Sequence, residues 1–200
     1  MNFDPDFVEP SNVFASRLDA TGSASGEPVQ LTNETEATSG LHFASIELIA
    51  TDGGYLAAWS EGDTNFETGM DAYYVVRVQR LSPELEPEGS AVLVDDKMID
   101  IDQIEPSLVR WDEQTVALLW GRGTHIYICA GCTPDENVNL VLIDSRTLSP
   151  RSNVVELPAP AEVGGFLKRN VVRSDASLLM TLEITYHVHF EPGFAAFHCE

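Results

Sequence analysis

Asp52-Gly-Gly-Tyr-Leu-Ala-Ala-Trp59 is the stretch that decides the fold, because related stretches recur twice further along the chain. The first counterpart is Asp112-Glu-Gln-Thr-Val-Ala-Leu-Leu-Trp120, and the second is Ser174-Asp-Ala-Ser-Leu-Leu-Met-Thr-Leu182. The residues that end the three stretches follow one another at steps of 61 and 62 residues. Similarity at a spacing of tens of residues is typical of a chain built from one repeated structural unit.

Further recurring segments lie between these stretches and predict four short strands per unit. The segments are rich in Val, Leu, Ile, Tyr and Trp and are bounded by Gly, Pro, Asp and Asn, as strands are. No window shows a convincing helical period, so the predicted class is all-β. The segments 13–19, 76–82 and 141–149 correspond to one another, and the strands are expected near 44–51, 54–61, 72–81 and 90–95, then near 106–111, 115–121, 138–144 and 152–157.

Four-stranded antiparallel units at this spacing predict a β-propeller-like array, in which no blade buries its faces alone. The pattern resembles bacterial secreted and lipoprotein-type β-propellers, where V-x-x-R-L-D precedes V-x-L-T and G-G-Y-L-x-A-W. Residues 14–32 and 53–61 carry it well, and later units carry it with drift, Ser145-Arg-Thr-Leu148 replacing R-L-D. The resemblance covers nearly the whole chain. It implies a propeller fold and an extracellular, periplasmic or cell-surface location, but no activity.

We expect one domain over residues 1–200, made of about three blades' worth of strands. Closed propellers usually have about four to eight blades. Three interpretations are open: a fragment of a longer chain, an incomplete arc, or a half-ring that a homodimer completes. The expected units are a partial blade about 12–32, blades about 44–95 and about 105–157, and a partial blade about 166–200.

The chain is strongly acidic, with 11 Lys and Arg against 32 Asp and Glu and a formal net charge of −21. Such a surface repels nucleic acids and anionic lipids. No apolar stretch is long enough to span a membrane, and the first ten residues lack the pattern of a signal peptide. Nucleophile-elbow, phosphate-loop and zinc-protease motifs are also missing. We therefore expect a non-catalytic module that binds a protein or small ligand through its loop-bearing rim.

In such blades, the loops between second and third strands share a rim with the connections between blades. Here they are Glu61–Asp71, Arg122–Asn137 and the turn around Glu191-Pro-Gly193. A turn centred on Pro192-Gly193 predicts that His187 lies opposite His198, with His189 on the same polar face. Three imidazoles so placed could hold Zn²⁺ as the site of a hydrolase or lyase, with Glu183 or Glu191 as general base. Otherwise they are solvated histidines on an exposed strand.

Two further groups could carry chemistry. Cys129 and Cys132, near His125, fit a disulfide, free thiols or half of a metal site. For an exported protein, as the resemblance implies, we favour the disulfide. The second group is an acidic run that could take Ca²⁺ or form a solvated surface. It contains Asp95, Asp96, Asp100 and Asp102.

Trp59 and Trp120 occupy equivalent positions in their units. A ligand-stacking role is one interpretation. Because the two positions are equivalent in the repeated strands, we predict instead that both side chains belong to the core between neighbouring blades.

Overall fold

The computed structural model describes residues 12–33, 41–63, 73–95, 106–122, 137–158, 166–174, 177–186 and 189–198. Within these residues the regular elements are all β-strands, β1 to β13, and the sheets that they form are antiparallel. The predicted all-β class is therefore confirmed. In the described part of the chain, no helix has the length and apolarity needed to cross a membrane.

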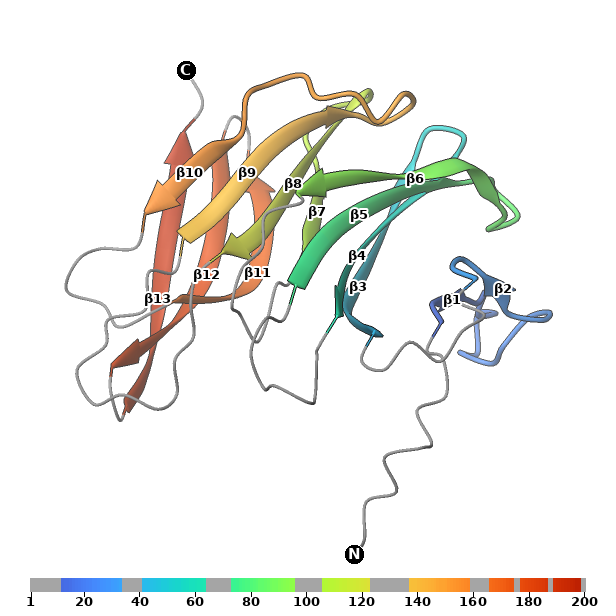
Figure 1. Ribbon diagram of the computed structural model, residues 1–200, viewed down its shortest axis with the longest axis horizontal. Coiled ribbons are helices and arrows are strands. Elements are labelled where there is room, and N and C mark those ends of the chain that lie inside the picture. Colours follow the sequence, from blue (N-terminus) through green and yellow to red (C-terminus); the bar gives the residue numbers. More distant parts are fainter. Residues whose placement is uncertain are drawn as a thin grey trace, which may run out of the picture.

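Two sheets contain four strands each, and in both the strands lie in the order of the sequence (Figure 1). Every strand thus pairs with the strand that follows it. The strands predicted for these units are confirmed, with ends that differ by up to three residues. They are β3 (Leu41–Thr51), β4 (Gly54–Asp63), β5 (Tyr73–Leu81) and β6 (Pro87–Asp95), then β7 (Ser107–Arg110), β8 (Thr115–Arg122), β9 (Asn137–Asp144) and β10 (Val155–Pro158).

Smaller sheets lie at both ends of this pair. One has two strands, β1 (Phe14–Ala15) and β2 (Val29–Gln30). The other has three, β11 (Phe166–Ser174), β12 (Ser177–Tyr186) and β13 (His189–His198). No sheet of the described residues closes on itself, so the structure establishes antiparallel sheets of two to four strands.

The central strands of the four-stranded sheets are buried on both faces. Along β4, Leu56, Ala57, Ala58 and Trp59 are all at most 1% exposed. Successive side chains of a strand point to opposite faces, so a doubly covered strand needs a continuous apolar run rather than an alternating one. This explains why the stretch that decides the fold, and its counterpart at 116–120, are apolar throughout.

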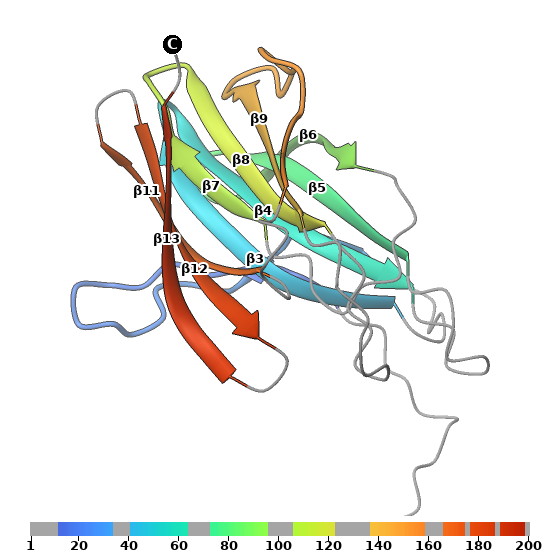
Figure 2. The same ribbon diagram turned by 90° about the vertical axis from the view of Figure 1, so that its left-hand side faces the viewer.

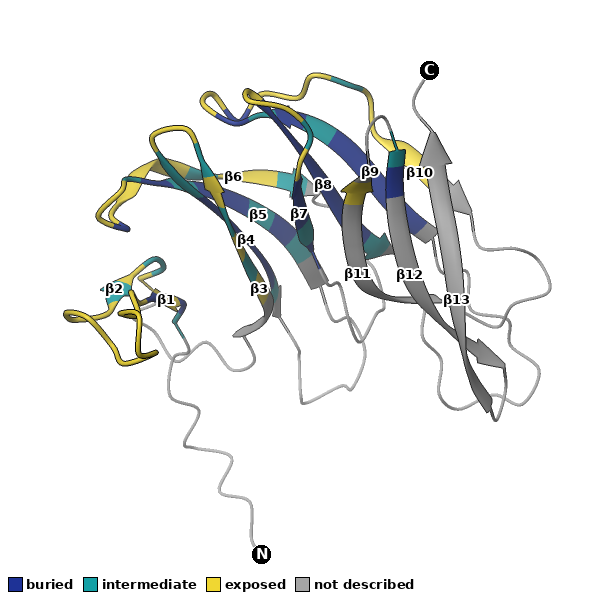
Figure 3. Cartoon of the chain, turned by 180° about the vertical axis from the view of Figure 1, so that it is seen from behind, coloured by how far each residue is buried: buried dark blue, intermediate teal, exposed yellow. Residues whose placement is uncertain are grey.

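The sheets stack face to face and form three apolar clusters. Leu56 and Ala58 pack with Val116, Leu118 and Trp120 between the two four-stranded sheets. The opposite face of β8 packs against β12, and the opposite face of β4 packs against β1 and β2. Figure 3 shows the buried residues concentrated in β4, β5, β8 and β9, with exposed residues in the turns.

The two tryptophans have the same place in this stacking. Trp59 belongs to the cluster with β1 and β2, and Trp120 to the cluster with β4 and β5, so each faces the sheet that precedes its own. Both are 1% exposed, which confirms the predicted core role. Val116 of β8 faces the preceding sheet, and Leu178 of β12, which lies 62 residues later in the sequence, does so too.

Burial also explains two leucines with left-handed backbone conformations. Leu85 (φ 70°) and Leu148 (φ 59°) lie in the connections that follow β5 and β9. An L-residue in this region costs about 1–2 kcal/mol. Both side chains are buried, at 3% and 8% exposure, between neighbouring sheets. The equivalent turn after β1 has Gly22 (φ 82°), which adopts this conformation without steric cost.

The first strands of successive sheets lie beside one another. β7 lies between β3 and β11 (Figure 2). The side chain of Glu47 in β3 accepts a hydrogen bond from the backbone N–H of Leu108 in β7, with a donor–acceptor distance of 2.9 Å. Asp52, which directly follows β3, and Arg110, the last residue of β7, form an ion pair at 2.7 Å. The two strands therefore run in the same direction, and the first strand of one sheet lies next to the first strand of the other.

Candidate functional site

One edge of the stacked sheets carries the described connections within the four-stranded sheets: residues 52–53, 82–86, 111–114 and 145–154. We call this edge the short-turn rim, and it forms the upper border of these sheets in Figure 1. The opposite edge, the long-loop rim, is where β4, β6, β8, β10 and β12 end.

The short-turn rim is closed by turns that cap their own backbone. In the turns after β1, β5 and β9, one side-chain oxygen accepts hydrogen bonds from two backbone N–H groups within the next four residues. The Thr21 hydroxyl, and next the backbone N–H groups of Ser23 and Thr21, stabilise the ionised carboxylate of Asp19 and hold its pKa below the usual value. The capping residues are Asp19 (2.8 and 3.1 Å), Ser82 (3.0 and 3.3 Å) and Asp144 (both 2.9 Å).

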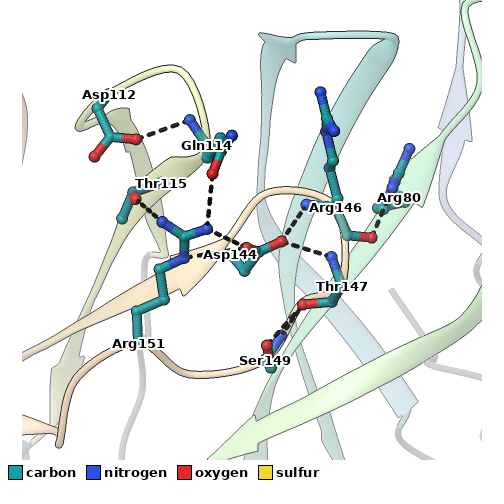
Figure 4. Close-up of polar contacts among 9 residues, drawn as sticks. All are labelled: Arg80, Asp112, Gln114, Thr115, Asp144, Arg146, Thr147, Ser149 and Arg151. Carbon is teal, nitrogen blue, oxygen red and sulfur yellow. Dashed lines mark hydrogen bonds and ion pairs between the residues drawn. The ribbon is translucent and has the colours of Figure 1, made fainter.

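Arg151 ties two of these turns together (Figure 4). Its guanidinium forms an ion pair with Asp144 and donates hydrogen bonds to the Thr115 hydroxyl at 3.0 Å and to the Gln114 amide oxygen at 3.3 Å. The backbone N–H of Thr147, and next the Arg151 side chain, hold the pKa of Asp144 far below its usual value. This network connects the loop after β9 to the turn between β7 and β8.

Other arginines on the same rim connect neighbouring sheets. Arg80 donates a hydrogen bond to the backbone oxygen of Arg146 at 2.6 Å (Figure 4). Arg173 of β11 lies over the Trp111 ring, 5.0 Å from its centre. Since these side chains are engaged within the protein, we assign the short-turn rim a structural role.

Two of the three segments predicted to bind a ligand begin and end at strand ends on the long-loop rim. The ends of β4 and β8, Asp63 and Arg122, pair with the starts of β5 and β9, Tyr73 and Asn137. Asp95, the last residue of β6, pairs with Val76 at the same edge. The strand ends therefore support the expectation that the predicted loops leave from one edge.

One predicted rim residue has a described side chain. Glu61, near the end of β4, forms an ion pair with Arg77 of β5 and accepts a hydrogen bond from the Trp59 indole N–H at 3.3 Å. Its side chain is 14% exposed. Glu61 therefore stabilises this end of the sheet, with its charge balanced by Arg77.

Several candidate site residues lie outside the described residues, and their roles stay predictions. They are Asp96, Asp100 and Asp102 of the acidic run, both cysteines Cys129 and Cys132, and His187. Asp95 is placed by its backbone at the end of β6.

The register predicted for the histidine hairpin is wrong. Ile184 pairs with Glu191 and Tyr186 with His189, so the connection is at 187–188 and not at Pro192-Gly193. His198 pairs with Ser177, at the opposite end of the hairpin from His189. Nine residues of strand separate the two histidine backbones by about 30 Å. These strands therefore do not provide the shared face on which the zinc hypothesis relied, because the longer ladder prevailed over the local Pro-Gly turn signal.

The alignment of the repeated segments also did not identify Asp144 as a capping residue or Arg151 as its ion-pair partner. We aligned residues 141–149 with 76–82, but the capped turns place Asp144 opposite Ser82 and Asp19. The spacing itself was the available signal, since these capping positions are 63 and 62 residues apart.

Within the described ranges, no group of three or more His, Cys, Asp or Glu side chains is arranged to hold a metal ion. Comparison with known proteins adds no relative: no family model matches the chain, nor does any curated protein or solved structure.

Proposed function

We propose that this chain is a propeller-type binding module whose long-loop rim takes a positively charged partner. The observation that carries the proposal is the difference between the two rims. The short-turn rim has capped turns, and the side chains of Arg80, Arg151 and Arg173 on it are engaged within the protein. The long-loop rim is where two of the predicted binding loops, those after Asp63 and Arg122, begin and end.

The stacking of the sheets supports a propeller. Each four-stranded sheet buries both faces against its neighbours, and the first strands β3, β7 and β11 lie beside one another. Blades of a propeller pack in this way around a central axis. Such a scaffold holds variable loops on a rigid edge, which is where binding residues concentrate.

Charge indicates the kind of partner. Residues 61–72 contain four carboxylates and no basic residue, and residues 95–105 contain five carboxylates and one lysine. Asp63 and Asp95, from which the two segments continue, are strand ends on the long-loop rim. Their negative potential attracts cationic groups and accelerates their association at low salt.

Binding of an oligolysine peptide, followed by fluorescence anisotropy at low and high salt, tests the proposal. Asp96, Asp100 and Asp102 are replaced together by Asn, and the matched control replaces Glu84, Glu86 and Glu113 of the short-turn rim by Gln. We expect weaker binding in the first variant alone. Equal weakening in both would show attraction to the net charge rather than to one rim. A melting temperature that rises with Ca²⁺ in the native chain only would identify the metal as a ligand of this rim.

A further inference from the structure

Asn139 of β9 is a buried polar residue at the long-loop end of the contact between the two four-stranded sheets. It pairs with Trp120 of β8, close to the pair Arg122 and Asn137 that ends this ladder. Both Asn139 and Trp120 are 1% exposed. Cross-strand partners lie on the same face of a sheet, so Asn139 shares the face of Trp120, which packs against β4 and β5. The Asn139 side chain therefore lies in the protein interior, between two sheets.

The Asn139 side chain contains a hydrogen-bond acceptor that needs a donor. Its Oδ1 atom is buried and has no hydrogen-bond partner within the described part of the chain. A buried polar atom without a partner destabilises the folded state, so native proteins nearly always supply one, from the protein or from an ordered water. Gln79, a buried amide of β5, has the usual arrangement, since its Nε2 atom donates to three backbone oxygens at 3.1, 3.2 and 3.2 Å.

The equivalent place in the sheet of β3 to β6 is satisfied within the protein. There the cross-strand partner of the tryptophan is Arg77 rather than Asn139, and Arg77 forms an ion pair with Glu61. The sheet of β7 to β10 has Arg122 at the position of Glu61, and the shorter Asn139 at the position of the arginine. The acid–base pair that satisfies this place in the first sheet is therefore not repeated around Asn139.

We infer that Asn139 Oδ1 accepts a hydrogen bond from a buried water molecule, held between the two four-stranded sheets near the long-loop rim. Water is the smallest molecule that donates hydrogen bonds, which suits a site where Asn139 and Trp120 are both 1% exposed. Folded proteins contain about one buried water per 27 residues, and these waters bind buried polar groups that would otherwise lack a partner.

The facing sheet is also polar at this end. Ser60 of β4 is 0% exposed and continues the face on which Leu56 and Ala58 pack against the sheet of β7 to β10. A water molecule both donates and accepts hydrogen bonds, so it can serve polar groups of both sheets. The inference does not depend on what the long-loop rim binds.

NMR of the isotope-labelled full chain tests this inference directly. The side-chain amide signals of Asn139 are identified by their loss in Asn139→Leu. In the native chain we expect nuclear Overhauser cross-peaks between these amide protons and long-lived water. Rotating-frame spectra separate this contact from hydrogen exchange, because the two give cross-peaks of opposite sign. The amide protons of Gln79, which is 3% exposed and donates to backbone oxygens, are the control and should show no such contact.

Magnetic relaxation dispersion of the water signal, which counts long-lived bound waters, provides a second test. Asn139→Leu should contain one long-lived water fewer than the native chain, whereas the matched control Gln79→Leu should contain the same number. Circular dichroism checks that both variants fold, and the spectra of the native chain decide the question if either does not. Native spectra without a water contact at Asn139 overturn the inference. So does a protein side chain found as the donor to Asn139 Oδ1, or an unchanged number of waters in folded Asn139→Leu.

Discussion

The left-handed leucines allow a prediction of how glycine and alanine compare in stability at two buried positions. At a buried strand position such as Leu118, which is 0% exposed, Gly should be less stable than Ala. Removing the last methyl group costs about 0.8 kcal/mol, and the added freedom of the unfolded glycine costs about 0.5–1 kcal/mol. The Gly variant of Leu118 should therefore unfold with about 1.5 kcal/mol less free energy than the Ala variant.

At Leu85 these losses are offset by relief of backbone strain. Its φ of 70° costs an alanine as much as a leucine, about 1–2 kcal/mol, and costs glycine nothing. Leu85→Ala and Leu85→Gly should both be destabilised by about 2–5 kcal/mol through loss of the buried side chain. However, the two should have nearly equal stability.

Urea unfolding of the four variants, Ala and Gly at Leu85 and at Leu118, measures how much less stable Gly is than Ala at each position. The two values are then compared. The denaturant slope should be the same in all four, so that midpoints report stability. A Leu85→Gly protein that falls about 1.5 kcal/mol below Leu85→Ala, as expected at Leu118, would refute the argument.

Three further outcomes are expected. Gly54→Ala should lower the unfolding free energy by more than about 2 kcal/mol in thermal melts, since its Cβ would lie 2.1 Å from a backbone oxygen of β5. Gly53→Ala, whose Cβ would meet nothing within 4 Å, should lower it less. The lowered pKa of Asp144 stabilises the fold above the usual value of 3.8, so stability should fall as the pH drops below about 5; urea midpoints of Asp144→Asn should depend less on pH over this range. The Asp52–Arg110 ion pair is exposed, so a double-mutant cycle should give a coupling free energy below about 0.5 kcal/mol. A value well above about 1 kcal/mol would contradict this reasoning from exposure.

The candidate site could be predicted only in outline. Loop positions follow from strand positions, so the sequence indicated that the segments after Asp63 and Arg122 leave from one edge. The histidine register did not follow, because Pro192-Gly193 is a strong local turn signal and the competing ladder is long-range. β13 pairs with β12 over ten consecutive positions, and Pro192 is tolerated opposite Glu183 because β13 lies at the edge of its described sheet.

The amino-acid sequence by itself determined the all-β class, the strands of both four-stranded sheets and the core role of Trp59 and Trp120. It did so because strands covered on both faces require continuous apolar runs, which are visible locally. Only the tertiary structure decided the burial of left-handed Leu85 and Leu148 between neighbouring sheets and the hydrogen bond from Arg80 to Arg146. These depend on which sheet packs against which, and that neighbour is set by contacts between residues far apart in the chain.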